Sequence, residues 1–234
     1  LKSINMSITA KDVNELRKKT GAGMMDCKKA LTESNGDMEK AIDFLRKKGQ
    51  KIAAKRGDRD AREGLVISKS HNEYGYLLCL NCETDFVAKN DDFGTFANSL
   101  VDIAMKSESN TLEDLLNQKY ESSQLTVKEK ITEQSGVIGE KIEISAFEKI
   151  TAKKVVAYNH PGNQIATIVG LTIDEEEVGK QVAMQVAAMN PIALDQQSVS
   201  QDVIDREIEV GKDLAIQEGK PVEMAEKIAK GRLN

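Results

Sequence analysis

An α+β fold is predicted by three features of this 234-residue sequence. Three short helical patterns follow one another in the N-terminal part. Two strand hairpins, each followed by a helical pattern, occupy the middle of the chain, and a sheet with one apolar face needs such a helix as its cover. Two further helical patterns, separated by a turn, occupy the C-terminal part.

The N-terminal pattern predicts a compact module of three short helices. Thr9 is placed to cap the first helix, with Asp12 as the acid of a capping box. Gly21-Ala22-Gly23 predicts a tight turn, because residues with a Cβ fit such a backbone less easily. Asp37 is expected to cap the third helix and Gly49 to end it.

The first hairpin and its covering helix come next. Glu63–Ser70 and Tyr74–Cys82 are rich in Val, Ile and Leu and are expected to pair around a short turn. An apolar stripe at helical spacing follows, formed by Phe93, Phe96, Ala97, Leu100 and Ala104. A polar helical segment is then expected over residues 107–139.

A second cycle of strands and helix starts at residue 141. Strands are expected over residues 141–150, 155–159 and 164–173, the last two joined by a His-Pro-Gly-Asn turn. The helix over residues 176–189 is expected to direct four apolar side chains inward, namely Val178, Val182, Val186 and Met189.

The last pattern predicts an antiparallel helical hairpin. Gly219 and Pro221 separate the two helices. The residues expected on their apolar stripes are Ile204, Ile208, Ala215, Met224, Ala225 and Ile228. Such an arm does not bury itself fully alone, so we expect it to pack on another subunit or a partner.

These patterns divide the chain into four expected parts. They are a three-helix docking domain over residues 6–56, a first core subdomain over residues 57–140, a second over residues 141–190 and a helical-hairpin arm over residues 191–234. Met6 is the expected natural start, because residues 1–5 carry no pattern.

The composition excludes several classes of protein. A net charge of -5 argues against a general nucleic-acid binder. No apolar run approaches the roughly 18 residues of a membrane span, and the N-terminus shows no secretion or transit pattern. We therefore expect a cytoplasmic protein that contacts neither membrane nor nucleic acid directly. The basic stretch from Arg46 to Arg62 is interrupted by acids and is expected to be a solvated helix end, with an RNA-contacting patch as the alternative.

No group of residues assembles an active site, and we expect neither an enzyme nor a cofactor or metal centre. P-loop, hydrolase and metalloprotease motifs are missing from the sequence. Cys79 and Cys82 form a C-x-x-C pair, but they lie in or just after an apolar strand and lack a second pair. Together with Cys27 they are expected to be small buried residues.

The most informative segment is Thr84–Asn90, between an apolar strand and a patterned helix. Such a junction can present an acidic and an aromatic side chain outward on a rigid support. Phe86 has two interpretations. A buried core anchor is the commoner fate of an aromatic at such a junction; the other is an exposed side chain that acts on a partner. The polar residues around it argue against full burial.

Two longer patterns resemble the signatures of one family. Lys18–Leu31, with the sequence KKTGAGMMDCKKAL, resembles the N-terminal signature of elongation factor Ts, and Asn81–Asn90, NCETDFVAKN, resembles its second signature. The resemblance extends over essentially the whole chain from Met6. It implies a ubiquitin-associated-like three-helix domain, a core of two α+β subdomains and a helical-hairpin arm.

The resemblance also implies a function, that of the guanine-nucleotide exchange factor for the GTPase elongation factor Tu in a bacterium or a bacterium-derived organelle. Asp85 and Phe86 would wedge between helices beside the nucleotide and move residues that hold Mg²⁺. The partner-binding residues that match are Arg17, Thr20, Gly21, Ala22, Gly23, Met24, Met25, Thr84, Asp85, Phe86, Val87, Lys89, Asn90 and His160. His160 would face a β-barrel domain of the GTPase, and a turn residue without a partner is its alternative.

Three further expectations concern assembly and alternatives. Family members usually continue beyond the segment that matches Lys230–Asn234 into a strand and a helix, so the second sheet is expected to lack a strand. The arm leaves open a homodimer or a 2:2 complex. The alternative function is a peptide- or ubiquitin-type adaptor, which would use the three-helix module and would not need Phe86.

Overall fold

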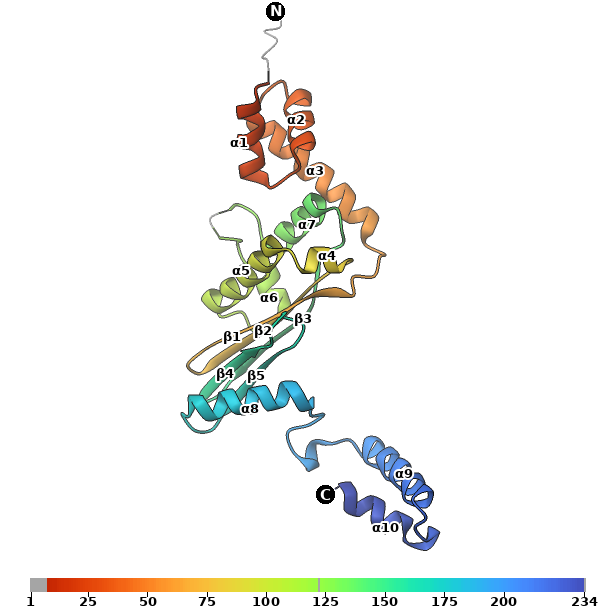
Figure 1. Ribbon diagram of the computed structural model, residues 1–234. Coiled ribbons are helices and arrows are strands. Elements are labelled where there is room, and N and C mark those ends of the chain that lie inside the picture. The colour runs from red at the N-terminus through yellow and green to blue at the C-terminus, as the bar shows by residue number, and fades with distance from the viewer. Residues whose placement is uncertain (1–7, 122, 234) are drawn as a thin grey trace, which may run out of the picture. The chain divides into compact units, whose positions relative to one another are not determined.

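The computed structural model describes residues 8–121 and 123–233 (Figure 1). The expected start at Met6 lies outside these residues, as does Asn234. The chain forms two compact units, one that runs to Ala187 and one that begins at Ala188. Within the described ranges, no helix is both long and apolar enough to cross a membrane.

The N-terminal module has the three predicted helices, α1 (Ala10–Thr20), α2 (Met24–Glu33) and α3 (Met38–Arg56). The capping box between Thr9 and Asp12 is confirmed. The side chain of Asp37 caps α3 as predicted, accepting the N–H of Lys40. The small core of the module consists of Val13, Leu16, Ala22, Cys27, Ala30, Leu31 and Ala41.

The third helix does not end at Gly49, so that prediction was wrong. Gly49 is buried inside α3 and lies against Gly136 of α7 (Val127–Ile138). A Cβ added to Gly136 would collide with the backbone of Gly49. A glycine late in a helical pattern suggests a stop, but here the missing side chain lets two helices touch. The contact joins the N-terminal module to the core.

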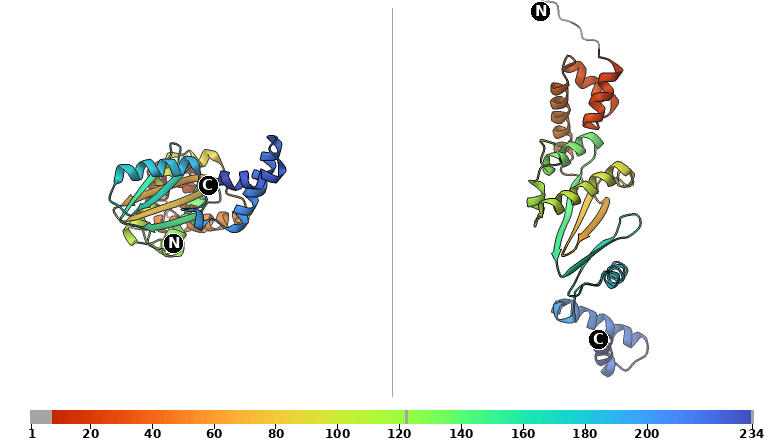
Figure 2. Two further views of the ribbon diagram at one scale, coloured as in Figure 1. Left: turned by 90° about the horizontal axis from the view of Figure 1, so that it is seen from below. Right: turned by 90° about the vertical axis from the view of Figure 1, so that its left-hand side faces the viewer.

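The first sheet is antiparallel with the order β1-β2-β3, formed by β1 (Glu63–His71), β2 (Tyr74–Cys82) and β3 (Glu143–Thr151). Helix α5 (Asp91–Ser107) covers one face, as Figure 2 shows. Alternate residues of β2 are buried on that face: Tyr76, Leu78, Leu80 and Cys82. The predicted stripe of α5 is buried in full: Phe93, Phe96, Ala97, Leu100 and Ala104. The first hairpin and its cover are therefore confirmed.

The polar segment after α5 contains two helices, α6 (Leu112–Leu116) and α7. The side chains of Thr111 and Thr126 cap these helices, in capping boxes with Asp114 and Glu129. Helix α7 then returns the chain to β3, which pairs with β2 and not with the strand that follows it. The sequence grouped this strand with the second hairpin, but a strand pattern does not specify its partner, and consecutive strands do not always pair.

The second sheet has two strands, β4 (Lys154–Asn159) and β5 (Ala166–Leu171). It packs on the first sheet, where a Cβ on Gly75 would collide with Val155. The amide of Asn159 accepts the N–H of Ser68 at 2.7 Å and donates to its carbonyl at 2.8 Å, as a neighbouring strand would do. A side chain thus joins the two sheets.

Helix α8 (Glu176–Met189) covers the second sheet through a face that the sequence did not predict. Its buried residues are Gly179 and Ala183, and Gly179 lies against Val156 and Leu171. The expected inward residues are not buried: Val178, Val182 and Met189 are exposed and Val186 is half-buried. The prediction was wrong because the largest apolar residues were assumed to face the core, whereas small ones allow this close approach.

The unit from Ala188 contains the predicted helical hairpin, α9 (Gln201–Gln217) and α10 (Val222–Leu233), after a short 3₁₀ turn, η1 (Gln196–Ser198). Small residues fill the interface: Gly211, Ala215, Ala225 and Ala229. The expected isoleucines of the stripe, Ile204, Ile208 and Ile228, are half-buried. Met224 is half exposed, so its inward assignment was wrong.

Candidate functional site

The segment Thr84–Asn90 forms a single helical turn, α4 (Asp85–Ala88), before α5 begins. Ala88 is buried and Val87 packs against the core, which fixes the inner side of the turn. Phe86 lies on the outer side and is 83% exposed. In the free chain this aromatic is therefore not a core anchor.

Charged and polar side chains hold the two ends of α4. The carboxylate of Asp85 accepts a hydrogen bond from Lys89 at 2.7 Å, which lowers the pKa of Asp85 and raises the pKa of Lys89. Asn90 caps α5 by accepting the N–H of Asp92 at 2.8 Å. The turn therefore leads directly into a well-started helix.

Two glutamates, Glu83 and Glu140, stabilise the backbone directly before α4. Glu140, which follows α7, accepts the N–H groups of Glu83 and Thr84 at 3.0 Å each and the hydroxyl of Thr84 at 2.7 Å. The carboxylate of Glu83 accepts both 2.8 Å bonds of Arg56 and the N–H of Lys141 at 2.7 Å. We call Arg56, Glu83, Thr84 and Glu140 the brace.

The side chain of Glu83 is 12% exposed. Desolvation raises its pKa, but the hydrogen bonds from Arg56, Lys141 N–H and Arg59 together outweigh this effect and lower the pKa below its ordinary value. Sequence reasoning missed the brace, because Glu140 lies in no motif and the arginines belong to the stretch expected to be solvated. Other cations of that stretch are also paired, such as Lys48 with Asp26.

The turn between α1 and α2 presents the second expected set. Thr20 is buried, and its hydroxyl donates to Leu16 O at 2.8 Å and accepts the N–H of Ala22 at 3.3 Å. Gly21 has a φ of 71°, which favours glycine. Beyond the turn Met24 is 54% and Met25 74% exposed. Of the other residues in this set, Ala22 is buried while Arg17 and Gly23 are exposed.

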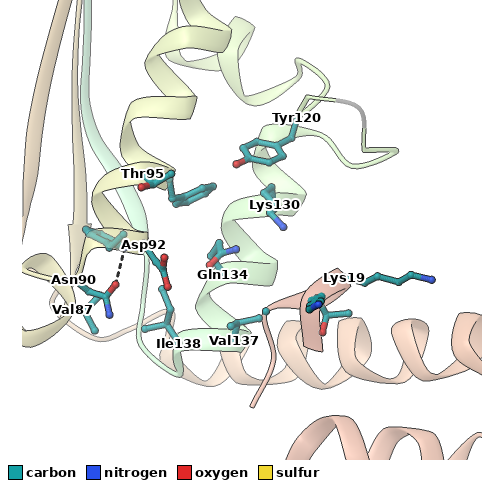
Figure 3. A pocket seen from close by; sticks show the side chains of 15 residues that line it. Lys19, Val87, Asn90, Asp92, Thr95, Tyr120, Lys130, Gln134, Val137 and Ile138 are labelled. Carbon is teal, nitrogen blue, oxygen red and sulfur yellow. Dashed lines mark hydrogen bonds between the residues drawn. The ribbon is translucent and has the colours of Figure 1, made fainter. Parts of the chain in front are cut away.

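The two signatures border the same hollow, of about 540 Å³. Figure 3 shows side chains from both modules around it, with Lys19 on one side and Val87 and Asn90 on the other. Helix α7 supplies Gln134 and Val137 to its wall. Segments about 70 positions apart in the sequence are thereby brought to one concave surface by the contact between α3 and α7.

A second hollow, with a volume of about 1120 Å³, also borders α4. Asp85 and Lys89 line it together with Gly162–Gln164 from the turn between β4 and β5. His160 belongs to the same turn but not to the lining. Its Nδ1 lies 2.9 Å from the hydroxyl of Tyr158, and the imidazole is exposed.

The described residues do not gather metal ligands or a reactive thiol at this site. No group of three or more His, Cys, Asp or Glu residues within residues 8–121 and 123–233 could hold a metal ion. Cys27 and Cys82 are buried as predicted, whereas Cys79 is half-buried. Burial raises the pKa of Cys82 to about 11, which keeps this thiol protonated at neutral pH.

Comparison with known proteins places this arrangement in a family. The family model described as Elongation factor TS matches residues 83–234. A protein named Elongation factor Ts from Christiangramia forsetii is 54% identical over 231 residues, which is 97% of this chain and 83% of the relative. The chain belongs to the elongation factor Ts family.

Two further elongation factor Ts relatives extend the match. The protein from Amoebophilus asiaticus is 50% identical over 235 residues, covering 98% of this chain and 84% of its own length. The protein from Parabacteroides distasonis is 45% identical over 227 residues, covering 96% of this chain and 68% of its own length. These matches include the N-terminal module, which the elongation factor Ts family model leaves out.

Proposed function

We propose that this chain is a guanine-nucleotide exchange factor for elongation factor Tu. Membership of the elongation factor Ts family supports the class of function. The observation that carries the mechanism is Phe86, an aromatic side chain that is 83% exposed on a turn fixed to the core. A protein gains nothing in its own stability from such an exposed aromatic.

In this mechanism Phe86 and Asp85 enter the GTPase between helices beside the nucleotide. Burial of a phenylalanine is worth about 1.5–3 kcal/mol, which is available to drive a rearrangement of the partner. Packed helices switch between discrete arrangements and do not deform smoothly, so a rigid wedge moves residues that hold Mg²⁺. Mg²⁺ neutralises the diphosphate, and weaker coordination of the ion therefore weakens GDP binding.

The coupling between factor and nucleotide is reciprocal. The factor lowers the affinity for GDP by the same ratio by which GDP lowers the affinity for the factor. The factor therefore accelerates exchange without selecting the nucleotide that binds next.

The other expected residues act as grips in this proposal. Met24 and Met25, which follow the turn between α1 and α2, provide an adaptable apolar contact to the GTPase domain. Arg17 and the backbone of Gly21-Ala22-Gly23 complete that surface. Thr84, Val87, Lys89 and Asn90 shape the surface around Phe86, and His160 contacts a separate domain of the partner.

The test is the release of a fluorescent GDP from elongation factor Tu. The wild-type chain should accelerate release, and Phe86→Ala should lose most of the acceleration while its melting temperature stays the same. Tyr74→Ala is the matched control, because Tyr74 is also a partly exposed aromatic but lies at the opposite end of β2. An adaptor that uses only the three-helix module would bind elongation factor Tu without accelerating GDP release. Phe86→Ala would then leave both the binding and the rate of release unchanged.

A further inference from the structure

We infer that Glu140 is a positioning residue, which holds α4 so that Phe86 is presented in one orientation; this inference rests on the proposed exchange function. Glu140 lies between α7 and β3 and is remote in sequence from α4. It nevertheless accepts three hydrogen bonds from Glu83 and Thr84, the two residues directly before α4.

The hydroxyl of Thr84 shows how the support reaches the helix. A hydroxyl has one hydrogen, and Thr84 donates it to Glu140 at 2.7 Å. Its oxygen is then oriented to accept from the N–H of Val87, the bond that caps α4. The carboxylate therefore sets the direction of the cap, and the cap sets the turn that carries Phe86.

A single helical turn needs such a support. Four residues in α4 are too few for the turn to be stable by its own hydrogen bonds. The inner side chains Val87 and Ala88 fix its distance from the core. The brace fixes the backbone immediately before it, through Glu140 on one side and the Arg56–Glu83 pair on the other. The thiol of Cys82 adds a hydrogen bond to the carbonyl of Thr84 at 3.2 Å.

The way in which Phe86 is presented should affect the rate of GDP release more than the affinity of the factor for elongation factor Tu. Insertion of Phe86 is a step within the complex, and much of the binding surface lies elsewhere, on the N-terminal module. A loosely held α4 therefore still allows binding but inserts Phe86 in fewer encounters. The maximal rate of GDP release should fall, whereas the concentration of factor at half-maximal rate should change little.

The experiment compares Glu140→Ala with Glu140→Gln in the full chain, measuring GDP release from elongation factor Tu over a range of factor concentrations. Glu140→Ala removes both acceptor oxygens, and with them all three hydrogen bonds, and should lower the maximal rate roughly five- to tenfold, the effect of leaving partly buried donors unpaired. Glu140→Gln keeps one oxygen for the two N–H groups but places an NH₂ donor at the Thr84 hydroxyl, so it should give a maximal rate between those of Glu140→Ala and the wild type. Glu129→Ala is the matched control, because Glu129 likewise accepts a backbone N–H and the hydroxyl of a capping threonine, Thr126, but at the far end of α7, and its loss should not change the rate.

A double-mutant cycle with Phe86→Ala separates positioning from a general loss of stability. If Glu140 acts through Phe86, then Glu140→Ala adds almost nothing in the Phe86→Ala background. Multiplicative losses would overturn the inference, and so would an unchanged maximal rate in a folded Glu140→Ala variant. Failure of the wild type to accelerate release would instead reject the exchange function itself, and the inference with it.

Discussion

Helix α4 and the turn between α1 and α2 both expose large apolar side chains, but different contacts hold them. The bonds of the turn are local, since Thr20 and Gly21 reach residues only four positions away. The brace behind α4 joins residues 27 to 57 positions apart. The turn therefore depends on its own three-helix module, whereas α4 depends on the assembled core.

In the proposed exchange function we expect the two surfaces to have different tasks. A locally held turn with flexible methionines suits an adaptable grip. An aromatic fixed from several distant segments suits a wedge, which must not yield when it meets a packed partner. We therefore expect changes in the brace to alter exchange through α4, and changes in the turn to alter affinity.

The largest effect on stability is expected from Gly136→Ala. The added Cβ would meet the backbone of Gly49, so α3 would have to move away from α7, at a cost of about 2–3 kcal/mol. Because α3 also carries Arg56, this change should loosen α4 as well. Urea unfolding would measure the loss.

Gly231→Ala provides the control for this prediction. Gly231 also lies in a helix, α10, but nothing is within 4 Å of an added Cβ there. This variant should be neutral or gain up to about 1 kcal/mol from helix propensity. Equal stability of both alanine variants would contradict the close contact between α3 and α7.

A smaller loss, of about 1–2 kcal/mol, is expected for Glu83→Gln. The neutral amide accepts fewer and weaker hydrogen bonds from Arg56, Arg59 and the N–H of Lys141. Hydrogen exchange should become faster at the Lys141 amide and in α4, but not in the turn around Gly21. Faster exchange in both regions would show that they are not held independently.

Thr20→Val should cost about 1 kcal/mol, because it removes one buried hydroxyl at nearly constant volume. The effect should be confined to the N-terminal module, where hydrogen exchange of the Ala22 amide should rise. Thr32→Val is a suitable control, since the Thr32 hydroxyl makes the same type of bond, to Lys28 O, at an exposed position. A slower GDP release at saturating factor would contradict the local role of Thr20.

The smallest expected effect is a dependence of the fold's stability on pH, through Glu83. The pKa of Glu83 lies below its ordinary value of 4.5 in the folded chain, so its carboxylate stabilises the fold above about pH 4.5. This contribution is lost as the pH falls through the folded pKa. The stability difference between wild type and Glu83→Gln should thus be constant from pH 7 to about pH 5 and shrink below pH 4.5. A difference that grows on acidification would contradict the assigned sign.

The sequence predicted the elements well where the pattern is local. The capping box at Thr9 and the apolar stripe of α5 follow from spacing alone, and the structure has both. The exposure of Phe86 was one of two open interpretations, because a strand-to-helix junction does not reveal which side of a short turn faces the core.

The features that the sequence did not predict depend on contacts between distant segments. Gly49 was mistaken for a helix end because its partner, Gly136, lies far along the chain. Glu140 was missed because it belongs to no motif. The pairing of β3 with β2 was missed because a strand pattern does not specify the partner strand. Close packing through Gly179 likewise reversed the expected inner face of α8.

The most direct test of the division between wedge and grip is a titration of GDP release from elongation factor Tu with two variants, Phe86→Ala and the double change Met24→Ala with Met25→Ala. Phe86→Ala should lower the maximal rate by about 30-fold or more, as expected for a residue that dominates an interface. The double variant should reach the wild-type maximal rate but need roughly tenfold or more of the factor for half-saturation, since each buried CH₂ that is lost costs about 0.8 kcal/mol. A normal maximal rate for Phe86→Ala, with only the half-saturating concentration raised, would contradict the account.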